Sequence, residues 1–414
     1  MGGTAPFFEP DLDANLKKAI SQKALTASTD PSSNSQSDIA YITVGTPSNS
    51  DGSINLSYVH AAAKDIGRSL RYTSGYQLIV IKSTVTPGTA RNILRPVVEE
   101  ESGKALGAGF GLCSNPEFLR EGRAIYDTEN PDRIIIGGDN AHAVTLLEQF
   151  YQEYHRPKIP PIIKTTHENA ELIKYANNAF LATKVSFINT IADIAQVTPG
   201  ADVTTIAKGI GLDARIGSRF LDAGLGWGGS CFPKDLGALV AYGTASGYEP
   251  QLLEAAVRTN QNQWKVAVEL AKKAIRQSLQ GKRIAVLGLS FKPDTDDMRN
   301  AVSISLIQGL LRNGATVAAY DPTALGNART IFKDKIEYAK SSTDCLMAAD
   351  CCIIATEWEE FKNLPPQVFL EKMKHPIVVD GRRIYNPDEM IHAGIMYSAV
   401  GLGKTQARRT AANA

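Results

Sequence analysis

The order of apolar segments along the chain constrains its fold more than any other sequence feature. Short apolar runs that end at glycine, proline or a polar residue alternate with helical patterns before residue 166 and again after residue 281. Between these two regions the apolar residues recur only at helical spacing. Because short buried runs separated by a helix are typical of β-α-β units, the chain is predicted to be α/β, then helical, then α/β again.

The predicted elements follow from this periodicity. One helix places Val59, Ala63 and Leu70 on a single face between two apolar runs, as a β-α-β unit requires. The strands and helices of the first lobe are expected at residues 38–47, 57–70, 76–84, 110–114 and 133–137. Those of the centre and second lobe are expected at residues 167–210, 251–280, 283–289, 302–312, 316–320, 351–356 and 376–380. The predicted domains are residues 1–165, 166–280 and 281–402, followed by a disordered polar tail at 403–414.

Composition excludes several classes of protein. A chain of 414 residues is longer than one core usually covers, and its net charge of +1 provides no basic surface for nucleic acid. The five cysteines are scattered and form no C-x-x-C pair, so reduced thiols in the cytoplasm are expected and a metal site is not. Apolar runs of membrane-spanning length and a signal peptide are also missing from the sequence, so no membrane partner is expected.

The glycine-rich stretch GLGWGGSCFPKD, residues 224–235, carries the strongest chemical signal. Gly224, Gly226 and Gly229 match G-x-G-x-x-G, but a helical pattern precedes them where a dinucleotide turn needs a strand. Such a loop can bring its backbone close to a ligand and present the thiol of Cys231. It can equally be a tight turn beside a buried cysteine, and the stretch alone does not decide between the two.

Four motifs follow one another along the chain: SNPEFLREG at 114–122, ELIKYANNAF at 171–180, GGSCFPKD at 228–235 and GLSFKPDTDD at 288–297. These motifs and their order resemble those of the UDP-glucose/GDP-mannose dehydrogenase family. Ser230 and Phe232, which flank the cysteine, resemble the members that oxidise UDP-glucose more than those that oxidise GDP-mannose or N-acetylated UDP-mannose. The resemblance implies two Rossmann-like lobes, a helical centre with a long helix, and NAD-dependent oxidation of UDP-glucose to UDP-glucuronate.

The resemblance also implies roles for individual residues. Cys231 would form a thiohemiacetal and then a thioester with the sugar, and Glu117 would act as acid and base in hydrolysis. The other implied catalytic residues are Lys174, Asn178, Asp235 and Thr84. Without the resemblance, Lys174 would be expected as a solvated helix charge and Thr84 equally as a strand cap.

Cofactor, substrate and partner contacts complete the implied site. NAD would contact Thr46, Thr84, Glu121, Lys234 and Arg299. Besides Glu117, Lys174 and Asn178, UDP-glucose would contact Phe118, Leu119, Arg120, Arg215, Gly224, Gly226, Trp227, Gly228, Phe291, Lys292 and Arg382. In the family, Arg215 reaches the site of a neighbouring subunit, so a homodimer or higher homo-oligomer is expected.

The sequence departs from the family pattern at its start. Relatives begin with a strand, a G-x-G-x-x-G turn and a helix, whereas residues 1–10 resemble the stretch that follows this unit. We therefore expect an incomplete first lobe, short of roughly 40 to 50 residues, more than a single β-α-β unit of about 30. This leaves as alternatives another nucleotide-sugar 6-dehydrogenase, and a nucleotide-sugar-binding protein inactive for lack of the NAD pyrophosphate turn. A cysteine hydrolase is a weaker alternative, because no histidine lies near Cys231 in the sequence.

Overall fold

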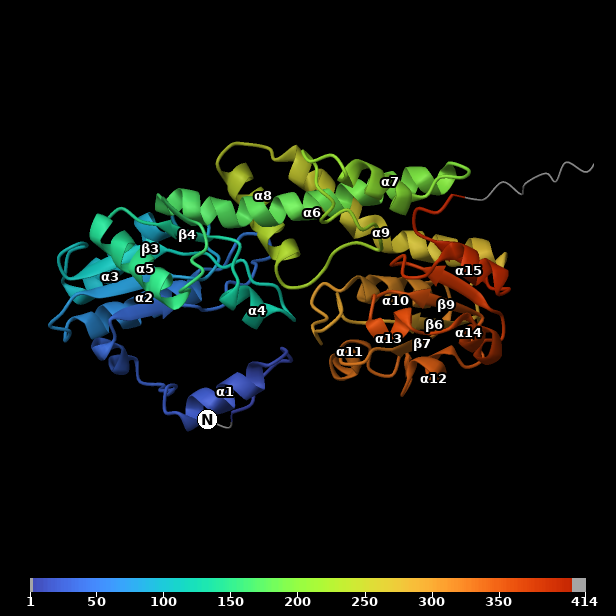
Figure 1. The fold of residues 1–414 in the computed structure, drawn as a ribbon, viewed down its shortest axis with the longest axis horizontal. Coiled ribbons are helices and arrows are strands. Elements are labelled where there is room, and N and C mark those ends of the chain that lie inside the picture. Colours follow the sequence, from blue (N-terminus) through green and yellow to red (C-terminus); the bar gives the residue numbers. More distant parts are fainter. Residues whose placement is uncertain (1–2, 404–414) are drawn as a thin grey trace, which may run out of the picture. The chain divides into compact units, whose positions relative to one another are not determined.

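The computed structural model describes residues 3–403 and divides into two compact units (Figure 1). The first unit comprises the chain up to Ala179 together with Lys234–Pro250, and the second comprises Phe180–Pro233 and the chain from Gln251 onward. Helices α6 (His167–Val197) and α8 (Phe232–Ala245) contribute residues to both. Across residues 3–403, no helix combines the length and the apolar character needed to cross a bilayer.

A five-stranded sheet in the order β1-β2-β3-β4-β5 forms the centre of the first unit. Its strands are β1 (Ile39–Ile42), β2 (Gln77–Ile81), β3 (Phe110–Ser114), β4 (Ile134–Gly137) and β5 (Ile162–Thr165). Strands β1, β2 and β3 are parallel, and Ile42, Ile81 and Ser114 are register partners, so their carboxyl ends meet at one edge of the sheet. Strands β4 and β5 are parallel to each other, and β4 pairs antiparallel with β3.

Helices cover both faces of this sheet. Alternate residues of β2 point to opposite faces: Ile79 packs with residues of α2 and α3, and Val80 packs with residues of α5. The helices are α1 (Leu12–Ser21), the 3₁₀-helix η1 (Pro31–Gln36), α2 (Ser57–Leu70), the π-helical turn η2 (Ala90–Leu94), α3 (Arg95–Ser102), α4 (Ala124–Glu129) and α5 (Ala141–Tyr154).

The second unit is built on a six-stranded parallel sheet in the order β11-β10-β9-β6-β7-β8. The chain winds outward from β6 to β8, then crosses to β9 and winds outward in the other direction to β11. The strands are β6 (Arg283–Leu287), β7 (Thr316–Tyr320), β8 (Glu337–Tyr338), β9 (Cys351–Ile354), β10 (Ile377–Asp380) and β11 (Met396–Ala399). The reversal places a topological switch point between β6 and β9, where open α/β sheets bind ligands.

Helices again cover both faces of the second sheet. Residues of α9 and α10 pack against Val286 and Ile353, and residues of α12 and α14 pack against Leu287 and Ile354. The helices are α7 (Val203–Gly211), α9 (Gln251–Ile275), α10 (Val302–Arg312), α11 (Leu325–Phe332), α12 (Ser342–Leu346), α13 (Glu359–Lys362), α14 (Pro366–Lys372) and α15 (Pro387–His392).

The predicted fold class is confirmed, and several elements agree with their predicted bounds. The helices at 57–70 and 302–312 and the strands at 110–114 and 316–320 lie where the periodicity places them. The helical region predicted at 167–210 contains two helices, α6 and α7, separated by a turn that contains Pro199 and Gly200. Gly200 has φ +80°, a conformation that glycine adopts without strain. Apart from Gly403, the tail predicted to be disordered lies outside the described residues.

Candidate active site

Helix α6 presents Lys174 and Asn178 on one face, as their spacing of four residues predicts. Lys174 is only 3% exposed, so it is not the solvated helix charge that its residue type alone suggests. Its Nζ donates hydrogen bonds to the backbone oxygen of Glu117 and to Glu117 Oε1, both at 2.7 Å. A buried ammonium needs such partners to offset its lost hydration. The Lys174–Glu117 ion pair is therefore the centre of the candidate site in the first unit.

Asn178 contacts a second carboxylate, that of Asp235 in α8. Asn178 Nδ2 donates to Asp235 Oδ2 at 2.6 Å, and Lys234 Nζ donates to Asp235 Oδ1 at 2.5 Å. Asp235 is 1% exposed, and these donors satisfy both of its oxygens. Five of the predicted site residues thus form two hydrogen-bonded groups joined by one turn of α6.

The loop after β3 supplies the carboxylate of the ion pair. Glu117 Oε2 accepts a hydrogen bond from the backbone N–H of Leu119 at 2.6 Å, which fixes the orientation of the carboxylate. The guanidinium of Arg120 is paired with Asp127, with Nε 2.9 Å from Oδ2. Arg120 is thus engaged within its own loop, although the resemblance assigns it to substrate. The guanidinium carbon of Arg133 lies 3.7 Å from the ring centroid of Phe118. Glu121, in the same loop, is partly buried.

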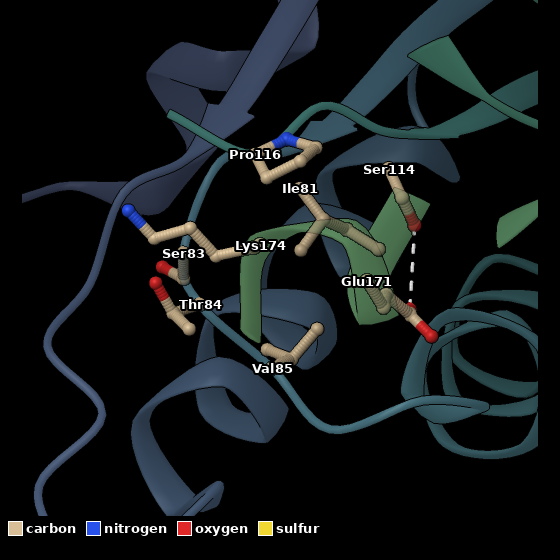
Figure 2. Close-up of a pocket in the computed structure, with 8 residues that line it drawn as sticks. All are labelled: Ile81, Ser83, Thr84, Val85, Ser114, Pro116, Glu171 and Lys174. Atoms are coloured by element: carbon tan, nitrogen blue, oxygen red, sulfur yellow. Dashed lines mark hydrogen bonds between the residues drawn. The ribbon is translucent and has the colours of Figure 1, made fainter. Parts of the chain in front are cut away.

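A small pocket lies at the carboxyl ends of β2 and β3, beside the first turns of α6 (Figure 2). Its lining residues are Ile81, Ser83, Thr84, Val85, Ser114, Pro116, Glu171 and Lys174. In Figure 2 the amino end of Lys174 and the carboxylate of Glu171 point in different directions. Thr84 contributes to the pocket wall, and Thr46 is buried in the loop after β1. The predicted Thr84 and Lys174 therefore border the same cavity.

Sequence reasoning assigned no role to two charged residues in this region, Glu171 and Lys82. Burial raises the pKa of Glu171 to about 7, although hydrogen bonds from the backbone N–H groups of Ala90 and Gly88 lower it. Burial lowers the pKa of Lys82 to about 8; nearby Glu117 raises it and Lys174 lowers it. Lys82 Nζ donates to Asn115 Oδ1 at 2.9 Å. Glu171 stands three residues before Lys174, and this helical spacing is the sequence feature that places Glu171 on the same face as Lys174.

Cys231 belongs to the second unit and stands immediately before α8. All five cysteines lie within residues 3–403, and Cys231 alone among them is not buried. Burial raises the pKa of the Cys113 and Cys345 thiols to about 12, which keeps them protonated. Ser230 Oγ lies 3.5 Å from Cys231 Sγ. Because a nucleophilic thiol must be accessible and able to ionise, Cys231 is the candidate nucleophile.

The glycine-rich loop before Cys231 is braced by amide side chains. Asn189 of α6 accepts from Gly224 N at 2.8 Å, and Asn260 of α9 accepts from Trp227 N at 2.7 Å and donates to Trp227 O at 2.8 Å. A Cβ atom on Gly228 would lie 2.3 Å from the carbonyl oxygen of Asn300, so only glycine fits there. The loop follows α7 and irregular backbone, which confirms that it is not a strand-to-helix dinucleotide turn.

The remaining predicted substrate residues of the second unit lie after strands. Phe291 and Lys292 follow β6, next to the switch point, and Arg382 follows β10. Arg382 Nε donates to Ala355 O at 2.8 Å and its NH1 donates to Gly226 O at 3.1 Å, which joins the strand end to the glycine-rich loop. Arg215 is highly exposed, and its Nη2 lies 2.6 Å from Asp213 Oδ2. Arg299 Nη2 lies 2.7 Å from Asp297 Oδ2.

Three models of one protein family match the chain in sequence order. They are the NAD binding domain, the central domain and the UDP binding domain of the UDP-glucose/GDP-mannose dehydrogenase family, at residues 1–155, 168–262 and 285–387. A UDP-glucose 6-dehydrogenase of Haloferax volcanii is 47% identical over 383 residues, which are 92% of this chain and 87% of the relative. One of Bacillus subtilis is 43% identical over 96% of this chain and 84% of the relative.

Solved structures agree with these matches. A UDP-glucose dehydrogenase of Pyrobaculum islandicum superposes with a TM-score of 0.86 at 36% identity, covering 96% of this chain and 88% of that one. A UDP-D-ManNAc dehydrogenase of Pyrococcus horikoshii superposes with a TM-score of 0.83 at 26% identity, covering 97% and 90%.

Proposed function

Because this chain belongs to the UDP-glucose/GDP-mannose dehydrogenase family, we propose that it oxidises UDP-glucose to UDP-glucuronate with NAD as the electron acceptor. The observation that carries this proposal is the partly exposed Cys231, which follows a braced glycine-rich loop and stands four residues before the buried Asp235 in the sequence. A dehydrogenase that stops at the aldehyde needs no such thiol, whereas oxidation to the acid can use a covalent thioester.

The proposed reaction removes four electrons from C6 of the sugar in two steps. NAD would accept one hydride in each of the two steps. The alcohol becomes an aldehyde, the Cys231 thiolate adds to it as a thiohemiacetal, and loss of the second hydride gives a thioester that water hydrolyses. Lys174 and Asn178 would stabilise the oxyanion of the addition and hydrolysis steps with preorganised donors. Glu117 would move the proton of the attacking water, with Lys174 and the Leu119 N–H holding its carboxylate in place.

The first unit fits a dinucleotide in part. Thr46 and Thr84 follow the carboxyl ends of the neighbouring parallel strands β1 and β2, the edge at which open α/β sheets place ligands. Lys234 of the same unit is held by Asp235, and Arg299 belongs to the second unit. We assign Thr46, Thr84, Glu121, Lys234 and Arg299 as NAD contacts. Among residues 3–403, the glycine fingerprint at 224–229 does not follow a strand, so the pyrophosphate is not assigned to it.

UDP-glucose is proposed to bind chiefly through the second unit. Lys292 and Arg382 provide positive charge for the diphosphate, and backbone N–H groups of the glycine-rich loop add donors. The switch point between β6 and β9 supports this placement. GDP-mannose is the alternative substrate within the family, and Ser230 and Phe232 favour UDP-glucose.

We propose that the protein is a homodimer or higher homo-oligomer. On α6, Phe180, Phe187 and Ile194 recur at intervals of seven residues and are each more than half exposed. A regular apolar stripe of this kind is typical of a helix that packs against a partner. A second copy also accounts for the highly exposed Arg215. Sedimentation of the purified chain at micromolar concentration should give at least a dimer, and a monomer would contradict the proposal.

The four-part division into residues 1–165, 166–280, 281–402 and 403–414 is retained as a proposal for the functional domains. In it the central helical part carries the stripe on α6 and the Cys231 loop. Cytoplasmic location is proposed from the chemistry of the thiols, since the reaction needs Cys231 reduced.

The test of the proposed function is stoichiometric. We expect two NADH per UDP-glucose consumed, with UDP-glucuronate as product, because alcohol to acid is a four-electron oxidation and each hydride carries two electrons. Absorbance measures NADH, and chromatography with mass detection measures the sugar nucleotides. A ratio of one with free aldehyde would overturn the thioester route. Faster turnover of GDP-mannose would move the substrate assignment within the family.

A further inference from the structure

We propose that Glu171 is a positioning residue whose carboxylate ties residues 83–90, here called the Thr84 segment, to helix α6 and so sets Thr84 relative to Lys174. This inference rests on the proposed function. Glu171 has no assigned role among the residues that the family resemblance implies. Its contacts, burial and place in the pocket carry the argument.

The carboxylate of Glu171 accepts hydrogen bonds from two other parts of the chain. Oε2 accepts from Gly88 N at 2.6 Å and Oε1 accepts from Ala90 N at 3.0 Å. Ser114 Oγ, at the end of β3, lies 3.3 Å from Oε1 of Glu171 (Figure 2). The same oxygen lies 2.9 Å from His167 Nδ1. One buried side chain of α6 therefore fixes the backbone that follows β2 and the end of β3.

The Thr84 segment is held at both of its ends. At its start, Ser83 Oγ donates to Val44 O at 2.6 Å and Ser83 N donates to Ile42 O at 3.0 Å. At its end, Gly88 and Ala90 bond to Glu171. Thr84 lies between the two attachments, on the wall of the pocket that Lys174 also lines. Release of the Glu171 end would therefore let Thr84 shift while Lys174 stays paired with Glu117.

Burying a carboxylate costs free energy of desolvation, so hydrogen bonds at its site must offset that cost. Glu171 is 3% exposed, and an apolar residue there would leave two backbone N–H groups without acceptors. The ionised form accepts both N–H groups more strongly than the protonated form. The titratable and charged groups around it are His167, Glu168, Lys174 and Tyr175 on α6, Arg91 on η2, and Asp139 after β4.

This arrangement predicts where the effect of Glu171 appears. Burial raises the pKa of Glu171 to about 7, so the tether weakens as pH falls through neutrality. Thr84 alignment affects the chemical steps, whereas Lys292 and Arg382 of the second unit bind the nucleotide. The pH dependence is therefore expected in kcat, with little change in KM for UDP-glucose.

The experiment compares Glu171→Gln, Glu171→Asp and Glu168→Gln in the full chain. Gln keeps the size of the side chain but loses its charge and one acceptor. We expect Glu171→Gln to lower kcat about tenfold or more, with KM within about twofold, since a small misplacement of a reacting group has effects of this size. The limb of the kcat profile near neutral pH should disappear in Gln and persist in Asp. Glu168→Gln removes a partly exposed carboxylate that also bonds the η2 helix, through Arg91, and should leave kcat nearly unchanged.

A readout independent of catalysis separates this inference from the proposed function. Hydrogen exchange of the amides at Gly88 and Ala90 should be faster in Glu171→Gln than in wild type and unchanged in Glu168→Gln. Unchanged exchange, or a kcat profile that keeps its neutral limb in the Gln variant, would overturn the assignment of Glu171. Equal losses of kcat in Glu168→Gln would overturn it as well. Absence of UDP-glucose oxidation by wild type would overturn the proposed function, while faster exchange in Glu171→Gln than in wild type would still support the tether.

Discussion

Two groups of buried charged residues, one in each unit, have their charge balanced in different ways. In the first unit, the buried Lys174 pairs with the partly buried Glu117, and the buried Asp235 pairs with the partly buried Lys234. In the second unit, the fully buried Asp321 accepts hydrogen bonds from the backbone N–H groups of Leu289, Ser290, Thr323 and Ala324, at 2.7 to 3.0 Å.

We expect this difference to distinguish groups that can react from groups that hold the fold. A carboxylate held by several backbone donors fixes the loops around it, and Asp321 joins the loop after β6 to the end of β7 in this way. Side chains that pair with each other can exchange protons or rearrange when substrate arrives. The first unit also contains Glu171 and Lys82, whose pKa values lie at about 7 and about 8. Glu171 is itself held by backbone N–H groups, so its shifted pKa, and not the kind of partner, sets it apart from Asp321. We therefore expect chemistry to depend on the first unit and nucleotide binding on the second, with Cys231 as the exception.

The Cys231→Ser variant tests that exception and should have the largest effect. Serine has a similar shape, so UDP-glucose binding through Lys292, Arg382 and the glycine-rich loop should persist. Its hydroxyl does not ionise readily, so NADH production should fall by a factor of about a thousand or more. Calorimetry checks the binding and absorbance checks the rate. Near-wild-type conversion to the acid would mean that Cys231 is a structural thiol and that hydrolysis proceeds through an aldehyde hydrate.

A matched pair of lysine variants sharpens the comparison directly. Lys174→Ala removes a buried donor of the first unit, and we expect kcat to fall about a hundredfold with a small change in KM. Lys292→Ala removes positive charge from the second unit, and we expect KM for UDP-glucose to rise about tenfold with a smaller change in kcat. Steady-state kinetics on both variants gives the result. A change mainly in KM for Lys174→Ala and mainly in kcat for Lys292→Ala would contradict the expectation that the first unit carries the chemistry and the second unit binds the nucleotide.

The sequence predicted the scaffold better than the site, for physical reasons. The spacing of apolar residues predicts buried strands and amphipathic helices, and the helix at 57–70 agrees with its prediction. Strand β5 was missed because only its ends are partly buried and it lacks a continuous buried run. The site depends on contacts between residues far apart in the chain: Glu171 bonds to Gly88 across 83 positions. A glutamate in a helix is usually solvated, so nothing local marks this one as buried.

The smallest expected effect concerns the pH dependence of stability, which Lys82 should influence. Its folded pKa, about 8, lies below the ordinary value of 10.5, because burial disfavours the ammonium. Between these values the unfolded chain binds more protons, so this residue makes the free energy of unfolding rise from about pH 8 to 10.5 and lowers it at pH 7.

Lys82→Met removes this linkage while keeping much of the side-chain volume. The free energy of unfolding of the variant, relative to wild type, should fall by about 1 to 3 kcal/mol from pH 8 to pH 10.5, because only wild type gains stability over that window. Loss of the hydrogen bonds to Asn115 and Tyr151 adds a constant offset, which leaves the slope intact. Urea unfolding at several pH values measures the slope. Lys208→Met, at an exposed position of α7 in the second unit, is the control and should leave it unchanged. Equal slopes for Lys82→Met and wild type would show that Lys82 stays charged and hydrated, and would remove one of the two shifted groups on which the contrast between the units rests.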